Sequence, residues 1–269
     1  MKRRSPILLS VLSVLVAVFA AQTAFAVTMS YGTFFGTNVT FDAASSCPVG
    51  LGICDTSTTG DFLDTPVIVG NSLFFSPTEF KAESSVAGGG IDVAGSLLDA
   101  EITTNASFII DSILIQEAGD ATLTSFPPPG DMSTGAFASF SGVVTVLETL
   151  SGPITPVLIN FKGTFTPPNI FDPDDLWLFL PGDPGTTTWS ASTVIDVASV
   201  VPDATKVVLA LDNDMTASNG AVENGNTSAK IQKKASNGLV ITIIPEPGTL
   251  ALLCGGLLGL AGLKRAGAK

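Results

Sequence analysis

The sequence predicts an all-β protein, an antiparallel β-sandwich of the jelly-roll-like type. Three observations support this fold class. The stretch from Val27 to Ile244 is rich in Thr, Ser, Val, Ile and Phe, which favour strands. Gly, Pro, Asn and Asp interrupt it about every 8 to 15 residues, the spacing of turns in a sandwich. Almost no helical periodicity is present, and no low-complexity linker divides the stretch, so we expect one domain over residues 27–244.

The first half of this domain is predicted to contain short strands joined by tight turns. Gly36-Thr37 and Gly70-Asn71 each lie between two apolar runs, and Gly and Asn accept the positive φ of hairpin turns. Residues 42–66 are predicted to form an irregular acidic loop. The expected strands are Tyr31–Phe35, Asn38–Phe41, Val67–Val69, Leu73–Phe75, Glu79–Val86, Leu97–Thr104 and Ser107–Glu117, of which the last two form a long hairpin.

The second half contains longer runs separated by loops rich in Pro and Gly. The expected strands are Phe137–Leu147, Ile154–Phe165, Leu176–Leu180, Thr187–Val197 and Lys206–Leu211, followed by Ser228–Lys233 and Gly238–Ile244 as a last pair. A sandwich of this size needs large side chains inside, so we expect the aromatic residues in the core. They include Phe34, Phe35, Phe74, Phe75, Trp177 and Trp189. The alternative is that the two Trp residues form a sugar-stacking face.

The N-terminus has the organisation of a secretory signal peptide over residues 1–26. Lys2, Arg3 and Arg4 form a positive segment, and the apolar run Ile7–Ala21 follows. Ala24 and Ala26 then supply the small residues of a cleavage site, so Val27 is the expected first mature residue. The expected partners are the secretory translocon and signal peptidase. The alternative is an uncleaved N-terminal anchor, which the short apolar run disfavours.

The C-terminus ends in a short apolar segment with a proline-rich start and a basic end. Pro245, Glu246 and Pro247 precede a 16-residue uncharged run, Gly248–Leu263, and Lys264 and Arg265 follow it. Such a run makes a helix of about 24 Å, slightly shorter than a ~30 Å hydrocarbon core. Basic residues after a span remain on the cytoplasmic side. We therefore expect a short transmembrane helix at the C-terminus. This helix is expected to hold the chain only until the tail is removed, and the alternative is a permanent membrane anchor that is never processed.

This arrangement of residues 245–269 resembles the PEP-CTERM sorting signal of exopolysaccharide-producing bacteria. The resemblance implies recognition by exosortase, a membrane protease-transpeptidase that cleaves near the Pro-Glu-Pro triplet. Residues 185–269 are also similar to the C-terminal half of many secreted proteins with this signal. The resemblance thus implies an exported protein that is held briefly in the inner membrane by its C-terminus and then released to the cell surface or the extracellular matrix.

The charge balance and the residue usage exclude several functions. The chain carries 12 basic and 24 acidic residues, and removal of residues 1–26 and of the segment after Glu246 leaves 6 basic residues against 24 acidic ones, a net charge of −18. Nucleic acid and anionic lipid need a basic face, so neither is an expected partner. The chain contains no His, which excludes Ser-His-Asp and Cys-His catalysis and histidine metal sites. An exported glycan hydrolase using two carboxylates stays open, but no acidic pair stands out.

Two further features concern the cysteines and the acidic residues. In an exported protein Cys47 and Cys54, seven residues apart, are expected to form a disulfide, and the alternative is a redox or metal pair. Residues 212–223 place Asp212, Asp214, Thr216 and Glu223 at positions 1, 3, 5 and 12 of a calcium-loop spacing. However, position 6 is Ala217 instead of Gly, and the flanking runs are strands. The alternative is a hairpin loop whose Asp and Asn side chains bond their own backbone.

Another acidic cluster that could bind calcium is Asp172, Asp174 and Asp175. Together these observations predict a non-enzymatic exported protein without an obligatory cofactor. Its expected role is structural, in an exopolysaccharide matrix or biofilm. The first alternative is a calcium-dependent carbohydrate-binding module, and the second is an exported glycan hydrolase.

Overall fold

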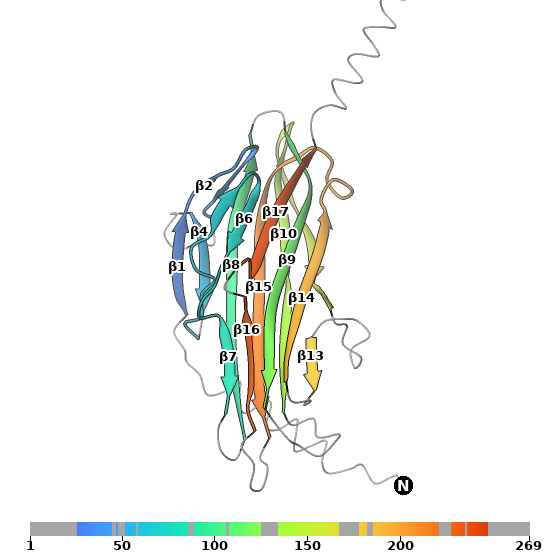
Figure 1. Ribbon diagram of the computed structural model, residues 1–269. Helices are drawn as coiled ribbons and strands as arrows, with labels where there is room; N and C mark the ends of the chain where they lie inside the picture. Colours follow the sequence, from blue (N-terminus) through green and yellow to red (C-terminus); the bar gives the residue numbers. More distant parts are fainter. Residues whose placement is uncertain are drawn as a thin grey trace, which may run out of the picture.

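The computed structural model describes residues 26–44, 47, 52–57, 59–85, 89–105, 108–124, 134–166, 178–181, 185–220, 227–234 and 236–246. In this part of the chain all the regular structure is β-strand, and the strands form two antiparallel sheets (Figure 1). The predicted all-β, two-sheet fold is therefore confirmed. The predicted signal-peptide helix and C-terminal helix lie outside the described residues.

The first sheet, sheet A, has the strand order β1-β4-β8-β15-β10-β11, with β13, β2 and β3 attached to it. Its strands are β1 (Val27–Gly32), β2 (Phe34–Phe35), β3 (Val39–Asp42), β4 (Ile53–Ser57), β8 (Gly90–Thr104), β10 (Gly135–Thr149), β11 (Gly152–Lys162), β13 (Leu178–Pro181) and β15 (Ala204–Asn219). The centre of the sheet is β15, which pairs with β8 on one side and β10 on the other.

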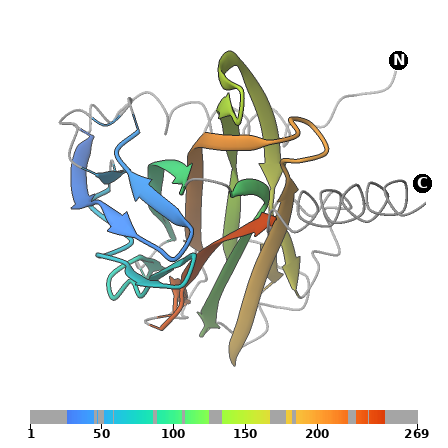
Figure 2. The same ribbon diagram turned by 90° about the horizontal axis from the view of Figure 1, so that it is seen from above.

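The second sheet, sheet B, has the order β12-β14-β9-β17-β6-β5, with β16 and β7 attached. Its strands are β5 (Val67–Val69), β6 (Ser72–Phe75), β7 (Lys81–Ser84), β9 (Ile109–Leu123), β12 (Thr164–Thr166), β14 (Gly185–Asp196), β16 (Ala229–Lys233) and β17 (Leu239–Glu246). Seen from above, the N-terminal strands, blue to cyan, gather on one side of the molecule (Figure 2).

The core lies between the two sheets, because side chains alternate between the inside and the outside along each strand. In β15, Val207, Leu209 and Leu211 are buried, while the residues between them face outward. Of the aromatic residues expected in the core, Phe75 and Trp189 are buried. Phe35 is 75% exposed, so that prediction is wrong for it. The short strand β2 lies at the edge of sheet A, where one side of the strand faces solvent.

The turns at Gly36-Thr37, Gly70-Asn71 and Ser151–Pro153 connect paired strands as predicted. Two predicted hairpins are wrong. The strands β8 and β9 follow each other along the chain but belong to opposite sheets. The strands β16 and β17 do not pair with each other. Instead, both pair with β9, one beyond the other along it.

Candidate functional site

The first two residues of the Pro-Glu-Pro triplet are part of sheet B. Pro245 and Glu246 end β17, where they lie opposite Ile110 and Ile109 of β9. The register shifts between Ile244 and Pro245, which fits a residue that lacks the N–H needed for a regular ladder. Pro247, Lys264 and Arg265 lie outside the described residues. The sorting triplet therefore begins within the folded domain.

The other processing residues lie at the opposite end of the chain. Ala26 is exposed and directly precedes β1, whereas Ala24 lies outside the described residues. In the part of the chain that the structure describes, no helix is long and apolar enough to cross a membrane. The signal-peptide boundary stays a prediction.

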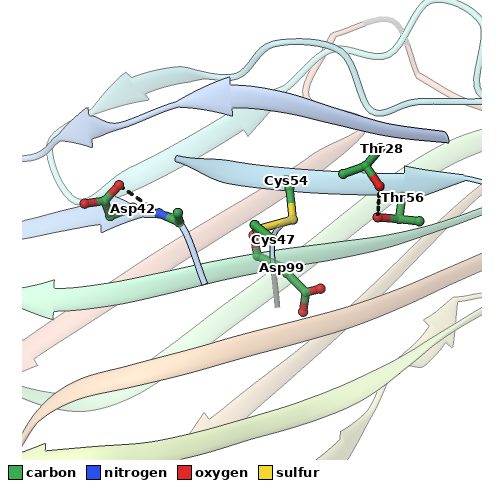
Figure 3. The surroundings of a disulfide bond; sticks show 7 residues. Thr28, Asp42, Cys47, Cys54, Thr56 and Asp99 are labelled. Atoms are coloured by element: carbon green, nitrogen blue, oxygen red, sulfur yellow. Dashed lines mark hydrogen bonds between the residues drawn. A yellow bond between two sulfur atoms is a disulfide. The ribbon is translucent and has the colours of Figure 1, made fainter. Parts of the chain in front are cut away.

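Cys47 and Cys54 form the predicted disulfide, with Cα atoms 5.8 Å apart (Figure 3). Cys54 belongs to β4 and lies opposite Asp99 of β8, and Cys47 Sγ lies 3.9 Å from the Asp99 carbonyl oxygen. Both cysteines pack with Ala44 in a small buried cluster, separate from the main core, against which Val208 is packed. The disulfide therefore fixes the segment before β4 against sheet A, and its role is structural.

The predicted calcium loop does not exist over residues 212–219, which belong to β15. This strand has ladder partners on both sides as far as Ser218, and those ladders prevail over the turn preference of Asp and Asn. Asp212, Asp214 and Thr216 therefore lie two residues apart on the outward face of sheet A. Glu223 lies outside the described residues, as does the cluster at 172–175. Among the described residues, no group of three or more acidic, Cys or His side chains could hold a metal ion.

The two aspartates of β15 nevertheless influence each other. Burial raises the pKa of Asp212. Burial, together with the nearby charge of Asp212, raises the pKa of Asp214 from 3.8 to about 6. The Asp214 carboxylate covers Gly95 of β8, where an added Cβ would lie 2.6 Å from Asp214 Oδ1. This close approach to the sheet explains the burial of Asp214.

The most unusual chemistry of the described chain lies inside the sandwich. Lys233 Nζ lies 2.6 Å from Glu117 Oε2 and donates a hydrogen bond to Asn213 Oδ1 at 3.1 Å. The Lys233 and Glu117 side chains are only 1% and 2% exposed. Asn213 is also fully buried. Since Lys233 and Glu117 belong to sheet B and Asn213 belongs to sheet A, the group connects the two sheets across the core.

Aromatic rings shield this group, which we call the Lys233 cluster (Lys233, Glu117 and Asn213). The ammonium lies 5.3 Å from the centre of the Phe80 ring and 5.9 Å from that of Trp189. Burial raises the pKa of Glu117 and lowers the pKa of Lys233, and the attraction between their charges opposes both changes. Glu117 Oε1 and Asn213 Nδ2 are buried and have no hydrogen-bond partner among the described residues.

The sequence analysis missed this cluster, although the sequence contains a signal for it. In β16 the inward positions are Ala229, Ile231 and Lys233, and in β15 Asn213 interrupts the inward row between Leu211 and Met215. A charged or amide residue at an apolar position of a two-residue alternation marks a buried polar group. Which of these residues meet across the sheets depends on the topology.

A second buried polar group lies in sheet A. Tyr31 donates a hydrogen bond to Asp55 Oδ2 at 3.0 Å, and the Leu63 backbone N–H donates to the same oxygen at 2.9 Å. Burial raises the pKa of Asp55 to about 6, and these hydrogen bonds limit the change. Burial and the Asp55 charge also raise the pKa of Tyr31. This group ties β1 and the segment at Leu63 to β4.

The outward face of sheet B carries a shallow groove of about 490 Å³. Its floor follows one row of register partners across β12, β14, β9, β17 and β6. That row is Thr164, Ser192, Gln116, Val240 and Phe74. A neighbouring row contributes Thr166, Ser190 and Ala118, whose small side chains deepen the groove. The outward-facing side chains of both rows are uncharged.

The comparisons with known proteins concern the end of the chain. The family model of the PEP-CTERM protein-sorting motif matches residues 244–266. The chain therefore carries this motif, and the resemblance found in the sequence is confirmed. The motif implies export, a membrane-anchored C-terminus before processing, and processing by an exosortase-like membrane protease. The match begins at Ile244, so the motif and the end of β17 overlap.

No curated protein matches the chain. Among solved structures, a winged bean acidic lectin complexed with methyl-α-D-galactose is similar at 12% identity and a TM-score of 0.20, over 82% of this chain and 100% of that one. A structure of the infectious bursal disease virus Gx strain has 12% identity and a TM-score of 0.14, over 91% and 68%. The GH31 α-xylosidase from Xanthomonas citri has 8% identity and a TM-score of 0.11, over 80% and 34%. Likeness at this level carries no functional argument.

Proposed function

We propose that the protein is a non-enzymatic structural component of the cell surface or of an extracellular polysaccharide matrix, delivered there by an exosortase-like system. The observation that carries the proposal is the sorting motif, which directly continues the last strand of an acidic all-β domain. A net charge of −18 in the mature domain keeps such a protein soluble after release.

The proposal includes removal of the tail near Pro245. Only the three residues Pro247–Thr249 separate the end of β17 from the apolar part of the uncharged run, which starts at Leu250 and ends at Leu263. Fully extended, they span at most about 10 Å. Before processing, the end of sheet B that carries Ile109 and Glu246 therefore lies against the membrane surface, within reach of a protease in the bilayer.

The proposal is tested by following the protein in producing cells with and without the exosortase. We expect a shorter form outside the inner membrane in wild-type cells and a full-length membrane form in the deletion strain. Replacing Pro245, Glu246 and Pro247 by Ala should give the same membrane form in wild-type cells. Equal release from both strains would contradict the proposal.

A second candidate function, carbohydrate binding, is favoured by the groove on sheet B. In this row the hydroxyl and amide groups of Thr164, Ser192 and Gln116 can form hydrogen bonds with the hydroxyl groups of a polysaccharide. Phe74 offers a partly exposed ring, on which a sugar can stack, at one end of the row. Strands about 4.8 Å apart give the row a length of about 19 Å. The outward-facing side chains of the two rows are uncharged, and on an acidic protein this favours a neutral polysaccharide.

Affinity electrophoresis in gels containing neutral polysaccharides tests this second candidate. We expect retardation of the wild type, loss of retardation in the Phe74→Ala, Gln116→Ala variant, and no change in Leu158→Ala, an exposed residue of β11 in the other sheet. If a chelator abolishes the retardation, the binding depends on calcium, as in the alternative function considered from the sequence. Equal mobility of all variants in every gel would remove the candidate.

A further inference from the structure

The Lys233 cluster places an amine within hydrogen-bond distance of a carboxamide and of a carboxyl group in an almost completely buried site. Lys233 Nζ is 3.1 Å from Asn213 Oδ1 and 2.6 Å from Glu117 Oε2. The electrophilic Cγ of Asn213 is one C=O bond, about 1.2 Å, from Oδ1, so Nζ lies within about 4.3 Å of it. A shift of less than about 1 Å would bring the two reacting atoms to the attack distance of about 3–3.5 Å.

We propose that Lys233 and Asn213 become joined by an intramolecular isopeptide bond, formed by the folded protein itself with Glu117 as the proton-transfer group. The three residues belong to three different strands, β16, β15 and β9, so the reacting groups meet only after the two sheets have packed together. This inference does not depend on the function proposed above.

The reaction begins with a proton transfer from the Lys233 ammonium to the Glu117 carboxylate. It leaves a neutral amine and a neutral acid. Burial favours this state, since it lowers the pKa of Lys233 and raises the pKa of Glu117. A neutral amine has the free electron pair that a nucleophile needs.

The amine nitrogen then attacks Asn213 Cγ, and the Nζ–Cγ bond forms as the carbonyl π electrons move to Oδ1. The neutral Glu117 delivers its proton to Nδ2, and the carboxylate that results takes up the proton that Nζ loses. The Cγ–Nδ2 bond breaks, its electron pair leaves with nitrogen, and ammonia departs as the C=O bond re-forms. The products are one secondary amide, one ammonia molecule and Glu117 as the neutral acid, so no oxidant, reductant or further reactant is needed.

The unpaired atoms of the cluster fit these roles. Glu117 Oε1 and Asn213 Nδ2 are two of the buried polar atoms without a hydrogen-bond partner in the described part of the chain. An unpaired buried polar atom destabilises the folded state and needs an explanation. Here Oε1 is the carboxyl atom free to carry a proton, and Nδ2 receives that proton once the two atoms move within hydrogen-bond distance of each other. The rings of Phe80 and Trp189 exclude water, which also protects the product from hydrolysis.

The bond would change how the sandwich is held together. It would connect β15 of sheet A to β16 of sheet B covalently, at a position buried in the core. It would also replace a buried ion pair by a neutral amide and a neutral acid, and so remove the cost of two buried charges. A cross-link between sheets suits an exported protein that must withstand force and proteases outside the cell.

Mass spectrometry of the purified full chain tests the proposal. After reduction of the disulfide, we expect a mass lower than that of the sequence by one ammonia molecule. A tryptic digest should contain Val207–Lys230 joined to Ile231–Lys234, because trypsin does not cleave after the modified Lys233. The bond should persist after treatment with hydroxylamine. This treatment opens a succinimide at Asn219-Gly220, Asn224-Gly225 or Asn237-Gly238, which would give the same loss of mass.

Three variants separate catalysis from packing. Glu117→Gln keeps the shape of the side chain but cannot shuttle the proton, so its mass should equal that of its full sequence. Asn213→Asp should lose water in place of ammonia, a change that a merely structural role would not produce. Lys230→Arg, one of the outward positions of β16, should still lose ammonia. A wild-type chain of full mass, or a loss that hydroxylamine reverses, would overturn the proposal.

Discussion

Pro245, the first residue of the sorting triplet, lies opposite Ile110 in the next-to-last residue pair of the ladder between β17 and β9. Glu246 continues the pairing opposite Ile109. A protease binds its substrate as an extended segment in its own active site. Pro245 and Glu246 cannot bind there while they are paired with β9. The end of β17 must therefore detach before cleavage near the triplet. Since strand ends open more readily than strand centres, this detachment requires only local unfolding.

An insertion of Gly-Ser-Gly-Ser between Ile244 and Pro245 should accelerate processing. The inserted residues move the triplet away from β9 and remove the need for local unfolding. Pulse-chase labelling in producing cells measures the rate of conversion to the shorter form. The same insertion after Ser236, in the turn before β17, serves as the control and should leave the rate unchanged. A slower conversion with the first insertion would contradict the expectation.

Glu117→Ala should lower the free energy of unfolding by about 3–5 kcal/mol, because Lys233 loses its buried partner and, without the proton-transfer group, the Lys233–Asn213 bond does not form. The matched control is Glu101→Ala, which removes the partner of Lys206 from a pair at 2.9 Å whose side chains are 22–24% exposed. A partly exposed pair of this kind contributes about 0–1 kcal/mol. Urea unfolding of both variants measures the difference, and equal losses would contradict the assignment of Glu117 as the buried partner of Lys233.

Asp214→Asn should stabilise the protein at pH 7. The folded protein raises the pKa of Asp214 from 3.8 to about 6, so the protonated form is favoured in the folded state and the charged form costs stability above pH 6. Because water screens a partly exposed carboxylate, we expect a gain of about 1 kcal/mol, or about 2–4 °C in melting temperature. The gain should decrease as the pH falls from 6 to 3.8 and be absent below it.

Thermal melts of Asp214→Asn across this pH range provide the measurement. Asp120→Asn, at a partly buried position of β9, removes one charge far from Asp212 and is the control. A gain for Asp214→Asn that persists at pH 3 would show that the effect is not the titration of this carboxyl group.

Replacing both Cys47 and Cys54 by Ser should lower the free energy of unfolding by about 2–3 kcal/mol, the entropy expected for closing a loop of this length. The loop is short and the disulfide lies outside the main core, so the fold should persist. Circular dichroism tests the persistence of the fold, and urea unfolding under oxidising conditions measures the loss. An unchanged unfolding midpoint would mean that packing around Ala44 alone holds this segment.

The sequence allowed prediction of the features set by neighbouring residues, and not of those set by distant pairing. Composition and turn spacing were sufficient for the all-β class, and the Gly70-Asn71 turn was sufficient for the β5–β6 hairpin. The hairpin expected across residues 105–106 fails because the local pattern of β8 and β9 is the same whether they pair or cross to opposite sheets. Asp212 to Asn219 look like a loop locally, but two long ladders hold them in a strand.

The sites divide in the same way. The sorting triplet and the disulfide depend on short spacings within the chain, and both were predicted. The Lys233 cluster joins Asn213 of β15 and Lys233 of β16, which are 20 residues apart in the sequence, with Glu117 of β9. The groove joins residues from five strands. Both follow from strand order, which the alternation of side chains along a single strand does not specify.

The intact mass of the protein released by producing cells tests the central claim most directly. If the protein is exported, sorted and trimmed, the mass should correspond to a chain that begins at Val27 and ends near Pro245, with the disulfide formed and one ammonia molecule lost. The ends of the chain and the loss of ammonia are separate parts of the same measurement, so each can fail without the other. A released form that still contains Leu250–Lys269 would contradict the account of the C-terminal segment as a temporary sorting signal.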